Sequence, residues 1–228
     1  MTLMSPVGRE VLDEPDCPPE IARATLQDIA WSNTLFGGRV AVWYGVSRLI
    51  TDHEGPLTVL DLGAGAGDIT RYITRRGAER GVAITPLAFD RHREAAVLCR
   101  GRGLPACVAD AWALPLGPRS VDVIVISQLL HHFHRDAGAA LLRSLAPAAR
   151  LGIVVGDLRR SWLAAVGIWV AGLALRFHPV TRRDGFTSVR RGFTARGLSE
   201  LLLAAGLAGQ VYRRPGFRLV GVWRAAAA

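Results

Sequence analysis

The sequence predicts an α/β fold: a seven-stranded, mostly parallel sheet with helices on both faces and an antiparallel hairpin at its C-terminal end. Three observations predict it. A short apolar run, Val59–Leu62, passes through the glycine-rich turn Gly63–Gly67 into a helix. Apolar runs of strand length then alternate with helical segments, as βαβ units do. Two strand-like runs flank the tight turn Pro215-Gly216 and form the hairpin.

The composition suits one folded domain. The chain has 228 residues, of which 50% are hydrophobic and 21% charged, which fits a single α/β core and not a disordered protein. Its net charge is +9, and arginine carries the positive charge because the sequence contains no lysine. The arginines are scattered, and no zinc-finger, RNA-recognition or helix-turn-helix signature accompanies them. We therefore expect no nucleic-acid partner.

The cysteines and the N-terminal residues indicate the compartment. Cys17, Cys99 and Cys107 form no C-x-x-C pair and have no metal-ligand spacing, and this sparse, odd number fits a reducing cytoplasm. Residues 1–18 contain acidic residues and prolines but no apolar signal core, so we expect a flexible lead there.

Two helices are expected before the first strand and form a helical cap over residues 19–52. They cover Glu20–Ala30 and Arg39 to about Thr51, because the pair Gly37-Gly38 breaks the helical pattern. Two interpretations stay open. The pair packs over the sheet edge, or it forms a lid over a cofactor, with Arg39 reaching the carboxylate of that cofactor.

The glycine-rich turn is the centre of the predicted binding site. Its spacing is D-x-G-x-G-x-G, starting at Asp61 on the first strand (Leu57–Asp61), whereas dinucleotide sites usually show G-x-G-x-x-G. Gly63, Ala64 and Gly65 let the backbone approach a ligand, and the helix that starts near Asp68 offers unpaired N–H groups. A carboxylate at the mouth of the turn adds little to phosphate binding. A ligand with an ammonium and a sulfonium group tolerates it.

Acidic residues follow the next two strands. Asp90 ends the second strand, Pro86–Asp90, at 90 − 61 = 29 positions after Asp61. Its carboxylate suits a ribose diol, and the alternative is an N-cap for a helix over Arg93–Arg100. The third strand, Ala106–Ala109, runs into Asp110.

A fourth strand and a histidine cluster come next. Val121–Ile126 is apolar throughout, as a central parallel strand should be, and Ser127 follows it. His131 and His132 lie just beyond. Adjacent histidines diverge on a helix, and no nearby cysteine or H-E-x-x-H completes a zinc site, so we expect no metal. Either one histidine acts as a general base, or it packs under the cofactor with one nitrogen satisfied.

The remaining elements complete the sheet. We expect a helix over Asp136–Leu145, a fifth strand over Leu151–Gly156, an irregular polar segment over His178–Phe193, and a helix over Ala195–Ala205. Thr194 is a good N-cap for that last helix. The hairpin strands cover 209–213 and 217–223.

The stretch Trp162–Leu175 is the most apolar of the chain. It is shorter than the ~20 residues that a membrane span needs. It could be a buried helix, a wall of a substrate pocket or an interface helix, and the chain could be a monomer or a homodimer. Two tryptophans and the nearby Arg159, Arg160 and Arg176 keep contact with a membrane surface as a further alternative.

Residues from about Asn33 onward resemble the class I S-adenosylmethionine-dependent methyltransferases, mainly through Val59–Gly156. Four further segments resemble small-molecule methyltransferases of bacterial secondary metabolism, including those associated with type III polyketide synthases. These segments are Asn33–Gly38, Ser127–Phe133, Asp157–Ser161 and Ser188–Thr194.

The resemblance implies a Rossmann-like methyltransferase domain over residues 53–228, with a substrate-recognition insertion over about 158–193. S-adenosylmethionine is the implied cofactor and S-adenosylhomocysteine its product. In this pattern Asp110 accepts a hydrogen bond from the adenine amino group and the next N–H, of Ala111, reaches a ring nitrogen. Trp112 is a weaker candidate to flank the base. The implied cofactor contacts are Arg39, Asp61, Gly63, Ala64, Gly65, Asp68, Asp90, Arg91, Asp110, Ala111 and Ser127.

The narrower resemblance implies a phenolic or quinol-like aromatic acceptor. We expect O-methylation with His132 or His131 as general base, or with Arg190 or Arg191 stabilising the oxyanion. Methylation of a ring carbon is the alternative. A nicotinamide-dependent oxidoreductase is disfavoured by the turn spacing and the hairpin. A base-modifying methyltransferase is disfavoured because Ser127–Leu130 lacks a D/N-P-P-Y/F motif. A non-catalytic cofactor-binding protein stays as a rival.

Overall fold

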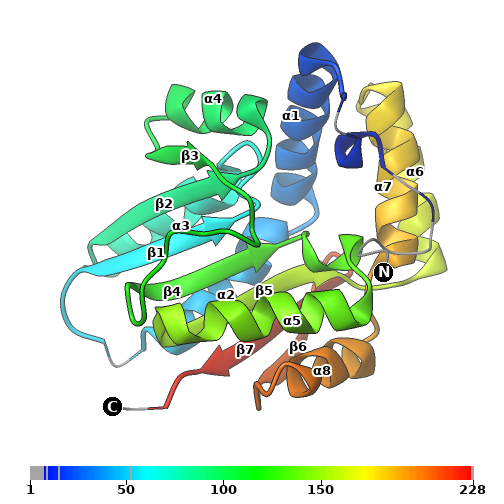
Figure 1. The fold of residues 1–228 in the computed structure, drawn as a ribbon. Helices are drawn as coiled ribbons and strands as arrows, with labels where there is room; N and C mark the ends of the chain where they lie inside the picture. Colours follow the sequence, from blue (N-terminus) through cyan, green and yellow to red (C-terminus); the bar gives the residue numbers. More distant parts are fainter. Residues whose placement is uncertain (1–7, 9, 15, 52, 227–228) are drawn as a thin grey trace.

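The computed structural model of the chain describes residues 8, 10–14, 16–51 and 53–226. In them, seven strands form one sheet in the order β3-β2-β1-β4-β5-β7-β6 (Figure 1). The strands are β1 (Leu57–Leu62), β2 (Ile84–Asp90), β3 (Ala106–Val108), β4 (Val121–Ser127), β5 (Ala149–Leu158), β6 (Gln210–Arg214) and β7 (Arg218–Arg224). The helices are α1 (Pro19–Leu35), α2 (Gly38–Leu49), α3 (Asp68–Ala78), α4 (Arg93–Gly101), α5 (Arg135–Leu145), α6 (Trp162–Ala174), α7 (Pro179–Arg191) and α8 (Ala195–Ala204), with short 3-10 turns η1 (Val11–Asp13), η2 (Leu130–His132) and η3 (Ala146–Ala148).

The strand directions confirm the predicted fold. Strands β1 to β5 run parallel, and β7 is antiparallel to both β5 and β6. Every residue of β4 is buried, as a central strand covered on both faces requires. Because parallel strands end at the same edge, Leu62, Asp90, Ser127 and Leu158 bring their loops together there.

Two layers of helices bury the faces of this sheet. Helices α2 and α3 form one apolar core with it, and α5 and α8 form the other. A Cβ on Gly45 of α2 would lie only 2.5 Å from Val154 Cγ1 of β5, so a glycine at this position allows the helix to approach the strand.

Helices α1, α6 and α7 stand together beyond the carboxyl ends of the strands (Figure 1). The expectation of an irregular segment over His178–Phe193 was wrong, because residues 179–191 form helix α7. Pro179 occupies its first position and the His178 ring accepts a hydrogen bond from Val180 N, so the segment has a good start signal despite its polar composition. Thr194 caps α8 as predicted.

Helix α6 lies in the apolar stretch, and the pocket-wall and interface alternatives both stay open for it. It is not a buried helix, since only Ala165 and Gly172 are buried and Leu163 is 74% exposed. Its inner side lines a cavity described below, and its outer side presents apolar side chains to the surface. Among the described residues no helix is both long and apolar enough to cross a bilayer.

Candidate active site

The glycine turn adopts the backbone that its sequence predicts. Gly63, Gly65 and Gly67 have φ values of +75°, +54° and +74°, in the left-handed region that other residues avoid. The backbone N–H of Gly65 donates to Asp90 Oδ2 at 2.9 Å, and that of His92 donates to Asp90 Oδ1 at 2.8 Å. Asp90 therefore ties the turn to His92, the residue before α4, and keeps further lone pairs for a ligand, whereas the N-cap of α4 is His92 and not Asp90.

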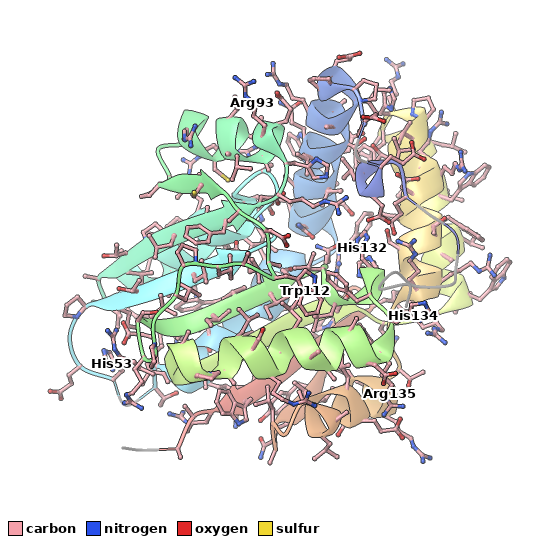
Figure 2. The ribbon with its side chains drawn as sticks, viewed as in Figure 1. His53, Arg93, Trp112, His132, His134 and Arg135 are labelled. Carbon is pink, nitrogen blue, oxygen red and sulfur yellow. The ribbon has the colours of Figure 1, made fainter. Side chains whose placement is uncertain are left out.

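A cavity of about 470 Å³ opens beside this turn at the carboxyl ends of the strands. Among the predicted cofactor contacts all except Arg39 line it, namely Asp61, Gly63, Ala64, Gly65, Asp68, Asp90, Arg91, Asp110, Ala111 and Ser127. Figure 2 shows Trp112 and His132 at this end of the sheet, with His53 at the opposite end. The strands thus bring residues that lie far apart in the sequence to one cavity.

Arg39 is the one predicted cofactor contact that does not line this cavity, and its role stays a prediction. Its guanidinium lies over the Tyr72 ring, 5.7 Å from the centroid, and lines a separate hollow with Arg71. It sits in the first turn of α2, and its charge lowers the pKa of Asp68, which lines both the cavity and this hollow.

Arg218, at the start of β7, lines the cavity instead. It is 4% exposed, and its Nη1 atom has no hydrogen-bond partner among the described residues. Burial lowers its pKa to about 10, an effect opposed by the charges of Asp157 and Asp68. It was not predicted from the sequence, because no ligand-binding residue was expected in the C-terminal hairpin. An arginine opening an otherwise apolar strand was the available signal.

Two acidic side chains at the ends of the glycine turn line the cavity, and each has an oxygen without a hydrogen-bond partner among the described residues. Thr70 Oγ1 donates to Asp61 Oδ2 at 2.5 Å, while Asp61 Oδ1 and Asp68 Oδ2 are buried without partners among the described residues. Burial raises the pKa of Asp61 to about 7, with help from the nearby charges of Asp68 and Asp90. Burial also raises the pKa of Asp68 to about 6, opposed by Arg39 and a hydrogen bond from Asn33. This part of the cavity suits a cationic group.

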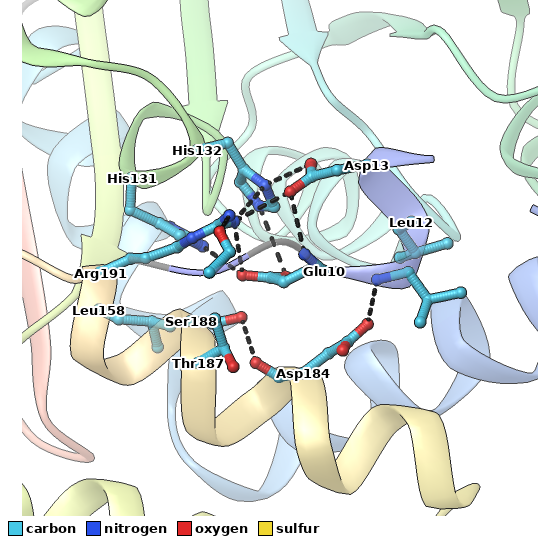
Figure 3. Close-up of polar contacts among 12 residues, drawn as sticks. Glu10, Leu12, Asp13, His131, His132, Leu158, Asp184, Thr187, Ser188 and Arg191 are labelled. Carbon is cyan, nitrogen blue, oxygen red and sulfur yellow. Dashed lines mark hydrogen bonds and ion pairs between the residues drawn. The ribbon is translucent and has the colours of Figure 1, made fainter. Parts of the chain in front are cut away.

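The two histidines meet on the wall of the same cavity, although adjacent histidines were expected to diverge. Each is turned by a carboxylate: His131 Nδ1 lies 2.7 Å from Asp157 Oδ1, and His132 Nδ1 lies 2.8 Å from Asp13 Oδ1. Because η2 is a single tight turn, the rings tilt toward each other with centroids 4.4 Å apart. Both Nε2 atoms face Glu10, as Figure 3 shows.

The described part of the N-terminal lead belongs to this site. Glu10 precedes η1 and Asp13 is its last residue, and both side chains are buried. Val11 N donates to Asp184 Oδ2 of α7 at 2.8 Å (Figure 3). Burial raises the pKa of Glu10. Burial would also raise the pKa of Asp13, but its hydrogen bond to His132 and the charge of that ring hold it below the usual value. Residues 10–13 are therefore packed against the site, while the predicted flexible lead over residues 1–18 stays a prediction. Residues 1–7, 9 and 15 lie outside the described residues.

The two arginines predicted to stabilise an oxyanion lie outside the lining of the cavity. Arg190 is exposed, and neither Arg190 nor Arg191 lines the cavity. Arg191 is buried, and its Nη1 pairs with Glu10 Oε1 at 3.1 Å and with Asp13 Oδ2 at 2.9 Å. Because both residues lie in the last turn of a helix, one points outward and the other into the acidic cluster.

The far half of the cavity is apolar. Its lining side chains come from η2, α6 and the hairpin turn, and they include Leu129, Phe133, Leu163, Ile168, Phe177 and Phe217. Trp112 packs edge-on against Phe133, with ring centroids 5.9 Å apart. At the junction of the two halves, Gln128 has φ +52° and donates to Asn33 Oδ1 at 2.6 Å, which connects the end of β4 to α1.

Comparison with known proteins identifies the domain. Residues 59–152 match a family model described as a methyltransferase domain. An uncharacterized methyltransferase of Mycobacterium tuberculosis is 34% identical over 145 residues, covering 58% of this chain and 55% of the relative, and one of Mycobacterium bovis matches equally. The chain thus spans about half the length of the curated relatives it matches.

Solved structures share the fold. Human N-acetylserotonin methyltransferase with S-adenosylmethionine has a TM-score of 0.62 at 14% identity, covering 90% of this chain and 56% of that one. The plantazolicin methyltransferase BpumL with S-adenosylhomocysteine has a TM-score of 0.58 at 20% identity, covering 80% and 74%. The chain therefore has the Rossmann-like fold of the class I methyltransferases, whose cofactor is S-adenosylmethionine, and its residues 59–152 match a methyltransferase domain.

Proposed function

We propose that the protein transfers a methyl group from S-adenosylmethionine to a hydroxyl of a small aromatic acceptor, of the phenol or quinol type. One observation carries the proposal: a single cavity joins the polar glycine turn to an apolar half, and the histidine pair lies on its wall. A volume of about 470 Å³ is in the range of small-molecule sites. An acceptor derived from polyketide-type secondary metabolism is part of this proposal, and it rests on the sequence resemblance.

The cavity has the groups that the cofactor requires. The unpartnered oxygens of Asp61 and Asp68 suit its ammonium group, and the buried Arg218 suits its carboxylate. Asp90 would bind the ribose, while Asp110 and the N–H of Ala111 would face the adenine. A side chain at Gly63 would crowd Leu129, because a Cβ there would lie 3.3 Å from Leu129 Cδ2. When bound, the cofactor supplies a methyl carbon that its sulfonium has already activated.

The chain's own residues then orient the acceptor and handle its proton. The apolar half excludes water and holds the ring near the turn. A phenol has a pKa of ~10, so its anion at pH 7 lies about 4 kcal/mol uphill. We propose His132 as the base, because Asp13 holds its Nδ1 and leaves Nε2 toward the cavity wall.

The test is product formation. Purified protein is incubated with S-adenosylmethionine and a panel of phenols, quinols and aromatic non-hydroxyl controls, and the products are measured by mass spectrometry and NMR. We expect O-methylated phenol and an equal amount of S-adenosylhomocysteine. Methyl groups on ring carbon would favour C-methylation, and tight S-adenosylhomocysteine binding without product from any acceptor would contradict the proposal. We also propose a cytoplasmic location, which the three free cysteines support.

A further inference from the structure

Three side chains beside the acceptor half form a compact set of donor atoms. Glu10, His131 and His132 each offer one atom, and these atoms lie within 4.8 Å of one another. Each histidine Nε2 lies 3.8 Å from a Glu10 oxygen, which is too long for a hydrogen bond. Metal–ligand bonds of about 2.0–2.2 Å place neighbouring ligand atoms roughly 3–3.5 Å apart. A small inward movement would therefore bring the three groups onto one cation.

The other ring nitrogens are already fixed as metal-binding histidines require. Asp157 holds His131 Nδ1 at 2.7 Å and Asp13 holds His132 Nδ1 at 2.8 Å. A carboxylate on the remote nitrogen sets the tautomer in which Nε2 has a free lone pair, and it increases the basicity of that lone pair. Figure 3 shows the two histidine rings with Glu10 and with Asp13, the partner of His132.

An orphaned atom is the second, independent observation. His131 is 3% exposed, and its Nε2 has no hydrogen-bond partner among the described residues. A buried polar atom without a partner is destabilising, and such atoms in native proteins are commonly explained by a ligand or ion. This nitrogen points at Glu10.

We propose that Glu10, His131 and His132 bind a divalent transition-metal ion, of the zinc or iron(II) class. Two imidazole nitrogens and one carboxylate are the donor set that these ions accept while keeping positions open. All three residues line the cavity, so the open positions face the acceptor. Arg191 contacts Glu10 and Asp13 and offsets part of the negative charge of Glu10, Asp13 and Asp157.

The metal deepens the proposed function and its role in turnover rests on that proposal. The acceptor hydroxyl binds the ion and loses its proton to solvent. The resulting oxygen anion attacks the methyl carbon, the carbon–sulfur bond breaks, and its electron pair stays on sulfur as the neutral thioether. With the ion bound, His132 is a ligand and the ion replaces it as the group that stabilises the phenolate.

The test measures metal binding without any acceptor. Wild-type protein is stripped with a chelator and titrated with Co²⁺, followed by visible absorption, and with Zn²⁺, followed by elemental analysis after dialysis. The same titrations are made on Glu10→Gln, His131→Gln and the control His134→Gln, which changes a nearby histidine outside the cluster. S-adenosylhomocysteine binding is measured on each sample as a test of folding.

We expect one ion per chain in the wild type and in His134→Gln, and affinity at least about tenfold weaker in Glu10→Gln and His131→Gln with S-adenosylhomocysteine binding retained. The inference is overturned if the wild type binds neither ion, or if Glu10→Gln binds as the wild type does. Should His131→Gln fail to fold, the isosteric Glu10→Gln carries the decision. Failure of wild-type S-adenosylhomocysteine binding would count against the proposed function and not against the metal site.

Discussion

Among single residues, Asp61 should contribute most visibly to the pH dependence of the free energy of unfolding of the ligand-free protein. Its pKa is raised from 3.8 to about 7, mainly by burial, so the folded state binds this proton more tightly than the unfolded state. The contribution of this bound proton to the free energy of unfolding is fully present below pH 3.8, and it is lost as the pH rises from there through about 7. A shift of this size corresponds to up to about 4 kcal/mol.

We therefore expect the free energy of unfolding of ligand-free protein to decrease between pH 5 and pH 7.5, and to decrease less in Asp61→Asn. Urea denaturation at both pH values measures this, with the exposed Asp136→Asn as control. Equal pH dependence in Asp61→Asn and wild type would contradict the assignment.

His132 should be needed for turnover whether it acts as base or as metal ligand. We expect His132→Ala to lower kcat by about 10²–10⁴-fold, because either role supplies stabilisation of the developing phenolate. His134→Ala should change kcat only a few-fold. If His132→Ala stayed within a few-fold of wild type, alignment of acceptor and methyl group alone would account for catalysis.

The two arginines near the turn can be separated by substitution. Arg218 is buried and lines the cavity, whereas Arg39 lines the neighbouring hollow, so we expect Arg218 to pair with the carboxylate of the cofactor. We expect Arg218→Met to raise the Kd of S-adenosylhomocysteine at least about tenfold and Arg39→Met to change it by less than about threefold, both measured by calorimetry. The opposite order would restore the prediction made from the sequence.

At the scale of elements, the junction between the glycine turn and α3 combines two constraints. Gly67 has φ +74°, and a Cβ there would lie 2.7 Å from Leu104 Cδ1 and 2.9 Å from Cys99 Sγ. Gly103 has nearly the same φ, +75°, with nothing within 4 Å. Alanine substitutions at these two glycines therefore separate the cost of backbone strain from the cost of steric overlap.

We expect Gly103→Ala to lower the free energy of unfolding by about 1–2 kcal/mol through left-handed strain alone. Gly67→Ala should lower it by a further ~1–3 kcal/mol, because the new methyl group overpacks against Leu104 and Cys99. Chemical denaturation of both variants measures the difference. Equal losses would mean that α4 moves aside freely.

Elements that sit on strong local patterns were predictable. The strands, the turn glycines and the cap at Thr194 follow from apolar runs, glycine spacing and side-chain capping within a few residues. Helix α7 was missed because its polar surface hides the 3.6-residue period, although His178-Pro179 marks its start. A local sequence pattern is thus most reliable for elements whose apolar residues form a clear run or period.

At the scale of the whole molecule, the fold brings together residues that no local pattern connects. Glu10 precedes His131 by 121 positions in the sequence, and Asp157 follows it by 26, yet all three meet at one end of the sheet. The cofactor half could be predicted because the residues of motif-bearing strand ends share one sheet edge. Glu10 and Asp13, the acidic partners from the N-terminal turn, could not be predicted, because the packing of that turn depends on tertiary contacts with α7.

Calorimetric titration of the purified protein with S-adenosylhomocysteine, with NAD as the control ligand, tests the central claim most directly. The account predicts binding of S-adenosylhomocysteine with a micromolar Kd, close to one site per chain, and no heat from NAD. Binding of NAD in place of S-adenosylhomocysteine, or no binding of either, would contradict it.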